Sequence, residues 1–200
     1  MSVLLAACQN TTSQPAPSPS PSPHNKPTTA ILQPGEIPSG LSECPGSGPI
    51  ADYIAKLQQS DVALATRMSD QWQQLRAKGA TDAAITLFAS DPSACTAELA
   101  ATSKAKSVAS FVATFAEEGQ AERAWGAGVL GFVTPAPDQL APGLLRGTGT
   151  SLGSSSWTYT SAQTRLACWR RSVFISLVVF TNLDSAAFKA VTAAIDARLN

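Results

Sequence analysis

The side chains that usually carry acid–base or nucleophilic chemistry are sparse in this chain. Its 200 residues include one histidine, His24, which lies in a Pro/Ser-rich stretch. A serine or cysteine nucleophile normally needs a neighbouring base, most often a histidine. Histidine-dependent catalysis is therefore close to excluded. We expect no catalytic residue, no cofactor-binding residue and no cofactor, and hence a protein that is not an enzyme.

Cysteines and carboxylates offer little more. Cys44, Cys95 and Cys168 show no C-x-x-C spacing, so we expect no metal ligand among them. Most acidic residues fall at predicted helix caps and first turns, where exposed backbone N–H groups explain them. One alternative stays open, an envelope hydrolase or transferase that uses carboxylates or a serine without histidine.

Two stretches could bind an anion. Arg165, Arg170 and Arg171 beside Trp169 could hold an anion or a lipid headgroup with help from the indole face, although a solvated hairpin tip explains them better. The glycine-rich run 147–153 has the composition of a phosphate-binding loop. Such a loop follows a strand and opens a helix. This run precedes a predicted strand, which favours a turn.

Aromatic residues mark a candidate contact surface. The stretch 134–153 is rich in Pro and Gly and is predicted to be a long surface loop that leads into the strand of Trp157 and Tyr159. With Trp169 and the Arg170-Arg171 pair, these aromatics are the candidate ligand contacts. The alternative is that the tryptophans belong to the core.

The elements that must hold these residues are helices followed by a sheet. Residues 155–180 combine β-branched and aromatic residues with two changes of polarity, as in a strand meander. Residues 49–78 carry an apolar stripe of helical period, with a gap at Ser60-Asp61 that marks either an N-cap between two helices or a polar position in one. The predicted fold class is α+β, with N-terminal helices followed by a mainly antiparallel sheet of about four strands packed against helices. Further helices are predicted at 82–88, 91–101, 117–125 and 184–199, and strands at 107–115, 155–159, 164–169 and 173–180.

Bulk properties exclude some partners. Fourteen basic and fourteen acidic residues cancel, so no broad field would attract nucleic acid. The longest strongly apolar run has eight residues, 173–180, whereas a membrane-spanning helix needs roughly 20. We expect neither nucleic acid nor metal as a partner.

The N-terminus has features of a targeting signal. Leu5-Ala6-Ala7-Cys8 resembles the lipobox of bacterial lipoproteins, which implies cleavage before Cys8 and its acylation, for instance with palmitate. Residues 9–41 are dominated by Pro, Ser and Thr, a composition typical of a disordered tether. Only seven residues precede Cys8, and none is basic, unlike a signal peptide. Either the true start lies upstream, or the precursor is truncated, or Cys8 is not lipidated. We predict a residual signal peptide at 1–8, a tether at 9–41 and one α+β domain at 42–200.

Export would permit a disulfide bond. Three domain cysteines leave one unpaired. Cys168 alternates with Leu166 on a predicted strand and suits burial as a small apolar thiol. The prediction is therefore a bond between Cys44 and Cys95.

Several short runs carry a wider resemblance. The chain resembles bacterial extracytoplasmic lipoproteins with sensor-like or PsbP-like α+β domains, and the likeness covers most of residues 70–200. It implies no reaction. The expected function is a non-catalytic ligand-binding or sensor-type module at the outer face of the cell membrane, with a small ligand or an envelope protein as partner. The runs are Asp-Pro-Ser-Ala-Cys (91–95), Ala-Ser-Phe-Val-Ala-Thr-Phe-Ala-Glu-Glu (109–118), Thr-Ser-Leu-Gly-Ser-Ser-Ser-Trp (150–157), Trp-Arg-Arg-Ser-Val-Phe (169–174) and the terminal Ala-Arg-Leu (197–199).

Lipidation can be tested by metabolic labelling. Cells that express the gene with its full upstream sequence and grow on an alkyne fatty acid should label the wild-type protein, and the Cys8→Ser variant should stay unlabelled. Equal labelling of the two proteins would contradict a lipid on Cys8.

Overall fold

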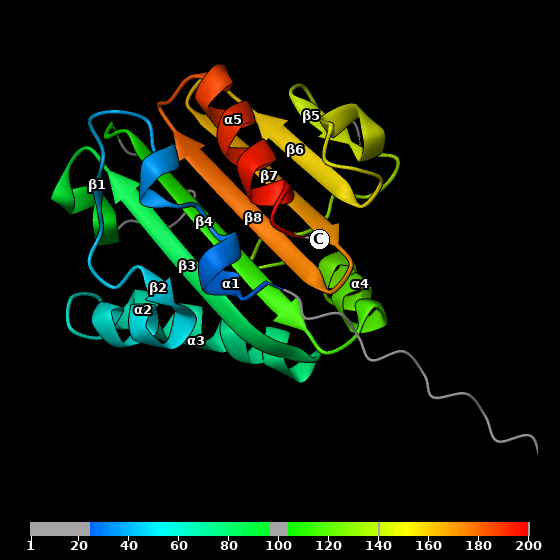
Figure 1. Cartoon of the computed structure of the whole chain (residues 1–200), viewed down its shortest axis with the longest axis horizontal. Coiled ribbons are helices and arrows are strands. Elements are labelled where there is room, and N and C mark those ends of the chain that lie inside the picture. Colours follow the sequence, from blue (N-terminus) through cyan, green and yellow to red (C-terminus); the bar gives the residue numbers. More distant parts are fainter. Residues whose placement is uncertain (1–24, 97–103, 140, 200) are drawn as a thin grey trace, which may run out of the picture.

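The most apolar run of the chain forms the strand β8 (Phe174–Thr181), in which every residue is buried. A strand with one face in water alternates apolar and polar residues, so a strand without that alternation must be covered on both faces. Its neighbour β4 (Ser107–Phe115) is likewise almost entirely buried. In the computed structural model, which describes residues 25–96, 104–139 and 141–199, helices accordingly cover both faces of the sheet (Figure 1).

The described strands form one antiparallel sheet of eight strands in the order β1-β3-β4-β8-β7-β6-β5, with β2 also paired to β3. Strands β3 and β4 pair with each other, and β5 to β8 form a meander. The last strand of the meander returns to pair with β4. The other strands are β1 (Ser42–Glu43), β2 (Gly48–Pro49), β3 (Ala80–Ala89), β5 (Leu144–Arg146), β6 (Ser156–Thr160) and β7 (Thr164–Arg171).

Three helices, α2 (Ile50–Leu57), α3 (Val62–Ala77) and α4 (Glu118–Ala127), cover the first face of the sheet. The N-cap of α3 is Asp61, whose Oδ1 accepts a hydrogen bond from the Leu64 N–H at 2.9 Å. The gap in the apolar stripe at residues 60–61 therefore divides two helices.

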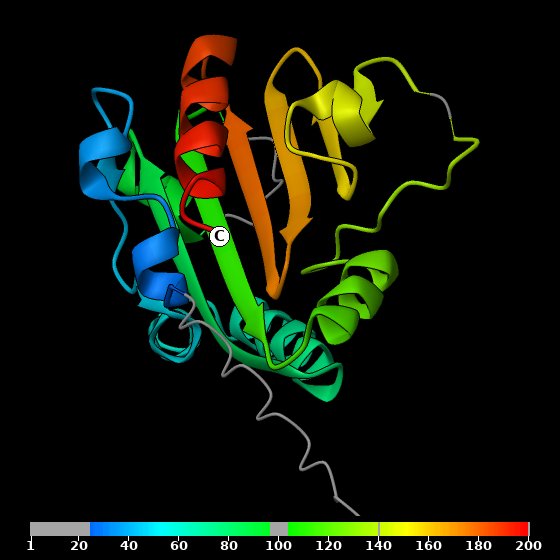
Figure 2. The same ribbon diagram turned by 45° about the vertical axis from the view of Figure 1, so that its right-hand side comes forward.

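The second face lies under α5 (Ser185–Asp196) and the short α1 (Pro27–Ala30). Figure 2 shows α1 and α5 on one side of the sheet and α4 on the other. Asp184 caps α5 by accepting from the Ala187 N–H at 2.8 Å. Phe188 of α5 meets Phe180 of β8 edge to face, with ring centroids 5.5 Å apart, a geometry that aromatic pairs favour.

The segment 27–41, here called the strap, crosses the second face over β3 and β4 and includes α1 and the 3₁₀ turn η1 (Pro34–Glu36). Ala30, Ile31 and Leu32 are buried, and the Leu32 N–H donates to Ser110 Oγ at 3.2 Å. The packed structure thus begins upstream of residue 42, the boundary expected from composition. Burial of these three consecutive apolar residues favours an ordered segment, although the strap also contains three prolines and two glycines.

Arg198, after α5, holds the strap. Its Nη2 donates to the Ile31 carbonyl at 2.9 Å and its Nε to the Ala30 carbonyl at 3.1 Å. Its guanidinium also forms an ion pair with Glu36.

The predicted fold class was wrong in two respects: the sheet has eight strands among the described residues, not about four, and the helices are not mainly N-terminal. Residues 82–88, predicted as a helix, belong to β3. This strand is buried on both faces, so its sequence lacks the alternation of apolar and polar residues that identifies a half-exposed strand. Its alanines fit a helix as well as a strand, and tertiary packing determined that the segment is a strand. Residues 92–96 form the 3₁₀ turn η2 (Pro92–Thr96), and the remainder of the predicted helix 91–101 lies outside the described residues.

The predicted disulfide bond is confirmed. Cys44 and Cys95 are bonded, with Cα atoms 5.4 Å apart, and the bond joins the residue that follows β1 to η2. Among the described residues the free cysteine is Cys168, which is buried in β7. Burial raises the pKa of the Cys168 thiol to about 12, against a smaller opposing effect of the Trp125 indole. This thiol is therefore uncharged and suited to packing.

The strap should respond to pH through Glu36. Burial raises the pKa of this carboxyl, but hydrogen bonds from Arg198 and from the Gln33 N–H, with the Arg198 charge, outweigh it and lower the pKa below its ordinary 4.5. A lowered pKa stabilises the folded state above the ordinary value, and this stabilisation is lost as pH falls through the folded pKa. We expect Glu36→Gln to lose about 1 kcal/mol of unfolding free energy at pH 7, and this loss should be smaller at pH 3.

Urea unfolding of wild type and Glu36→Gln at both pH values measures this difference. The exposed Glu43→Gln provides the matched control and should follow wild type at pH 7. A Glu36→Gln deficit that is equal at pH 3 and pH 7 would contradict the ion-pair account.

Candidate functional site

A cavity of about 430 Å³ opens on the first face, between the C-terminal end of α4, the loop 134–137 and the strands β5 and β6. Two tryptophans and two prolines account for most of its apolar wall, and one arginine and a few hydroxyls for its polar groups. The lining residues are Trp125, Gly126, Thr134, Pro135, Ala136, Pro137, Arg146, Gly147, Ser154, Ser156 and Trp157.

The sheet register sets the back wall. Arg146 of β5 pairs with Trp157 of β6, so the two side chains are cross-strand neighbours on one face. Directly opposed residues have Cβ atoms about 4.5–5.5 Å apart. The cation and the indole therefore line the same part of the cavity.

Hydrogen bonds hold the loop across the opening. Thr134 Oγ1 donates to the Trp125 carbonyl at 2.7 Å, which ties the start of the loop to α4. Arg146 Nη2 donates to the Gln139 carbonyl at 2.9 Å, which ties the far end to β5. The loop is thereby anchored on both sides of the cavity.

The Trp157 indole carries a donor without a partner. The residue is only 6% exposed, and its Nε1 forms no hydrogen bond within the part of the chain that the structure describes. The Nε1 of Trp125 lies near the Cys168 thiol, a weak acceptor, without reaching hydrogen-bond geometry. A buried N–H without an acceptor costs roughly 1–3 kcal/mol, so it calls for an explanation.

The aromatic residues singled out from the sequence do not gather at one site. Trp157 lines the cavity. Tyr159, two residues further along β6, is 38% exposed and pairs with Leu144 of β5. Trp169 is fully buried on the second face, because its partner in the register is Ser156 and not Trp157.

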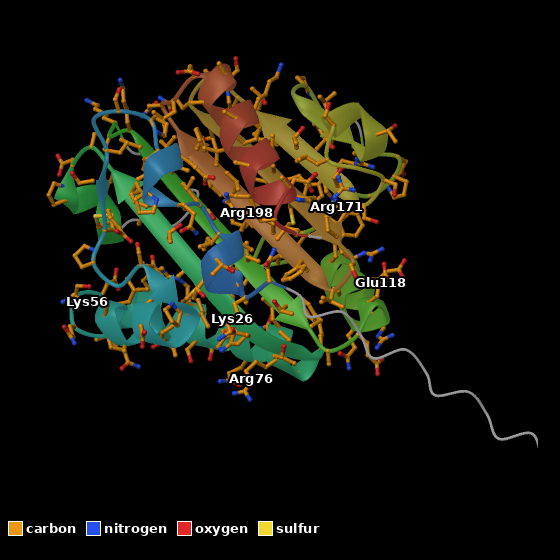
Figure 3. All side chains as sticks on the ribbon, in the orientation of Figure 1. Lys26, Lys56, Arg76, Glu118, Arg171 and Arg198 are labelled. Carbon is orange, nitrogen blue, oxygen red and sulfur yellow. A yellow bond between two sulfur atoms is a disulfide. The ribbon has the colours of Figure 1, made fainter. Side chains whose placement is uncertain are left out.

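The arginines at the end of the β7–β8 hairpin are bound to carboxylates. Arg170 pairs with Glu118 of α4 at 3.0 Å. Arg171 forms two hydrogen bonds with Asp196 of α5, at 2.7 and 2.8 Å. Figure 3 shows Glu118 and Arg171 on α4 and at the end of β7, near the same end of the sheet. These two arginines therefore link the hairpin to the helices on opposite faces.

The glycine-rich run forms a turn. Residues 147–150 make the 3₁₀ turn η3 (Gly147–Thr150), and β6 follows without an intervening α-helix. Ser156 holds this turn in place, since its Oγ donates to the Gly147 carbonyl at 3.0 Å and lies 2.6 Å from Thr150 Oγ1.

The charge of the cavity lining has one sign. Arg146 is the charged residue among the described lining residues, and none of these is acidic. Asp138, in the same loop, is exposed and forms no ion pair with Arg146. No group of three or more His, Cys, Asp and Glu side chains placed to hold a metal occurs among the described residues.

Trp125 and Arg146 were not singled out from the sequence. Trp125 ends the helix predicted at 117–125, and Arg146 lies within the predicted loop 134–153. Their meeting depends on β5, a three-residue strand without a sequence signal of its own. A cation directly after two leucines, Leu144 and Leu145, and ahead of the aromatic strand β6 is the one local hint.

Comparison with known proteins adds no relative: no family model, no curated protein and no solved structure matches this chain. None of the helices in the described part is both long and apolar enough to cross a membrane.

Replacing the aromatic residues should separate core from surface. We expect Trp169→Ala to lose about 3–5 kcal/mol of unfolding free energy, because it removes a fully buried indole. Tyr159→Ala should lose about 1 kcal/mol or less, because this residue is 38% exposed and its removal leaves no enclosed void. Chemical denaturation measures both. A Trp169→Ala protein as stable as Tyr159→Ala would contradict this assignment.

Proposed function

We propose that this protein is a lipid-anchored, extracytoplasmic binding module that holds a small molecule in the cavity between Trp125 and Trp157, and that it performs no catalysis. The cavity carries the proposal. Its volume of about 430 Å³ lies within the range of small-molecule sites, roughly 300–1,000 Å³. Its apolar walls with a few convergent polar groups also match such sites.

The Trp157 indole N–H, a donor without an acceptor in the described part of the chain, supports the presence of a bound ligand. Trp157 lines the cavity, and its indole N–H is buried and has no acceptor among the described residues. A ligand with an acceptor atom would remove that cost, and this gain would appear as affinity.

The location rests on three features of the chain. Leu5-Ala-Ala-Cys8 resembles a lipobox, and a long Pro/Ser-rich stretch separates it from the strap. The Cys44–Cys95 bond suits an oxidising compartment outside the cytoplasm. A lipid on Cys8 would then make the membrane the first partner, with the cavity free to bind a small ligand.

Filling the cavity tests the proposal. Gly126 lines it, and a Cβ added there would have no atom within 4 Å, so a side chain can extend into open space. We expect Gly126→Phe to fold normally and to lose the small molecule that co-purifies with wild type. Native mass spectrometry of protein from the original host measures this occupancy.

Gly126→Ala is the matched control. It should keep the ligand and gain up to about 1 kcal/mol, because alanine favours a helix more than glycine does. A Gly126→Phe protein that retains the ligand as well as Gly126→Ala would show that the cavity is not the binding site.

A further inference from the structure

We infer that the ligand of this cavity is a small monocarboxylate with an apolar body, held by Arg146 at its charged end. The inference rests on the proposed function and adds the chemical class of the ligand. Three features of the cavity restrict the chemical class of the ligand: its charge, its hydrogen-bond donors and its apolar wall.

The charge of the lining selects an anion of low charge. Arg146 contributes the positive charge, and within the described part of the chain no carboxylate lines the cavity to neutralise it. Arg170, Arg171 and Arg198 are instead engaged by acidic residues. A single guanidinium matches one negative charge, so a carboxylate fits better than a doubly charged phosphate.

The donors of Arg146 suit a carboxylate. A guanidinium has five N–H donors in a planar fork that matches two carboxylate oxygens. The protein uses Nη2 for the Gln139 carbonyl, at 2.9 Å. This bond fixes the side chain beside the loop and leaves further N–H groups for a ligand.

Trp157 supplies a second, neutral donor. It is the cross-strand neighbour of Arg146, and its buried N–H has no acceptor within the described residues. This nitrogen has almost no accessible surface, so an acceptor oxygen of the ligand, next to the carboxylate held by Arg146, would satisfy it after a small rotation of the indole toward the cavity. The pair thus specifies an acceptor-rich end of the ligand at one side of the cavity.

The opposite wall selects the body of the ligand. Trp125, Pro135 and Pro137 offer flat, apolar surfaces without a charge. Such walls favour a hydrocarbon body, either an aromatic ring or a short chain. An aromatic and an aliphatic ligand would share the same chemistry, a carboxylate on an apolar body. The probes below distinguish the two.

The test uses three matched probes that differ only at the polar end, namely 4-phenylbutyrate, 4-phenylbutanamide and 4-phenylbutylamine. The delipidated full chain is titrated with each probe, and binding is monitored by calorimetry and ligand-observed NMR. Affinity should decrease in the order carboxylate, amide, amine. We expect the carboxylate to bind at least tenfold more tightly than the amide. Octanoate, tested in parallel, distinguishes an aliphatic body from an aromatic one.

Two substitutions assign the contacts. Arg146→Gln should weaken 4-phenylbutyrate about tenfold to a hundredfold and leave the amide within about twofold. Trp157→Phe keeps an aromatic ring but removes the N–H, and it should weaken both probes by about fivefold. Arg123→Gln, an exposed change on α4 outside the cavity lining, is the control and should bind as wild type does.

The outcomes separate this inference from the proposed function. If 4-phenylbutanamide binds as tightly as 4-phenylbutyrate, or if Arg146→Gln binds the carboxylate as wild type does, the assigned class is wrong while the cavity remains a binding site. If Gly126→Phe leaves the binding of every probe unchanged, the cavity itself is not the site. If neither carboxylate binds the folded wild-type protein at millimolar concentration, the inference fails irrespective of Gly126.

Discussion

Burial of both faces of the central strands is the constraint on which the rest of this structure depends. Almost every side chain of β4 and β8 is buried, so each face of the sheet needs its own cover. The first face receives α2, α3 and α4, and the second receives α5 and the strap. Because the second face also buries Ser110, a backbone donor of the strap becomes its hydrogen-bond partner. The strap is thus part of the core.

The cavity lies where this cover ends. Helix α4 reaches the first face near β7 and β8, while β5 and β6 extend the sheet beyond it. A loop bridges the remaining distance, and a loop of prolines cannot fill the space as a helix would. Trp157 and Arg146, which line this space, are placed side by side by strand pairing, and Arg146 is also held by its hydrogen bond to the Gln139 carbonyl of the loop. A rigid wall faces an irregular one, which is common where proteins bind small molecules.

Local signals predicted the elements that are regular and strongly marked. The strand 107–115 and the last helix, predicted at 184–199, could be found from residue type and spacing. At Asp61 the sequence left two alternatives open, and the structure shows an N-cap that divides two helices. The Cys44–Cys95 bond followed from the unlike settings of the cysteines. Local signals could not predict the order of the strands, the alanine-rich β3 or the short β5. These features depend on pairing partners that are far apart in the sequence. The separation of Trp157 and Trp169 onto opposite faces depends on the same register.

The clamp around Arg198 has a mechanical consequence. Asn25 Nδ2 donates to the Arg198 carbonyl at 2.8 Å. The Arg198 guanidinium donates to the carbonyls of Ala30 and Ile31 and forms an ion pair with Glu36. Figure 3 shows Lys26 and Arg198 beside the same stretch of the strap. Tension applied to the chain before residue 25 would reach this clamp first and would peel the strap from the second face. Trp157 and the cavity, on the first face, would bear load only after the strap had detached.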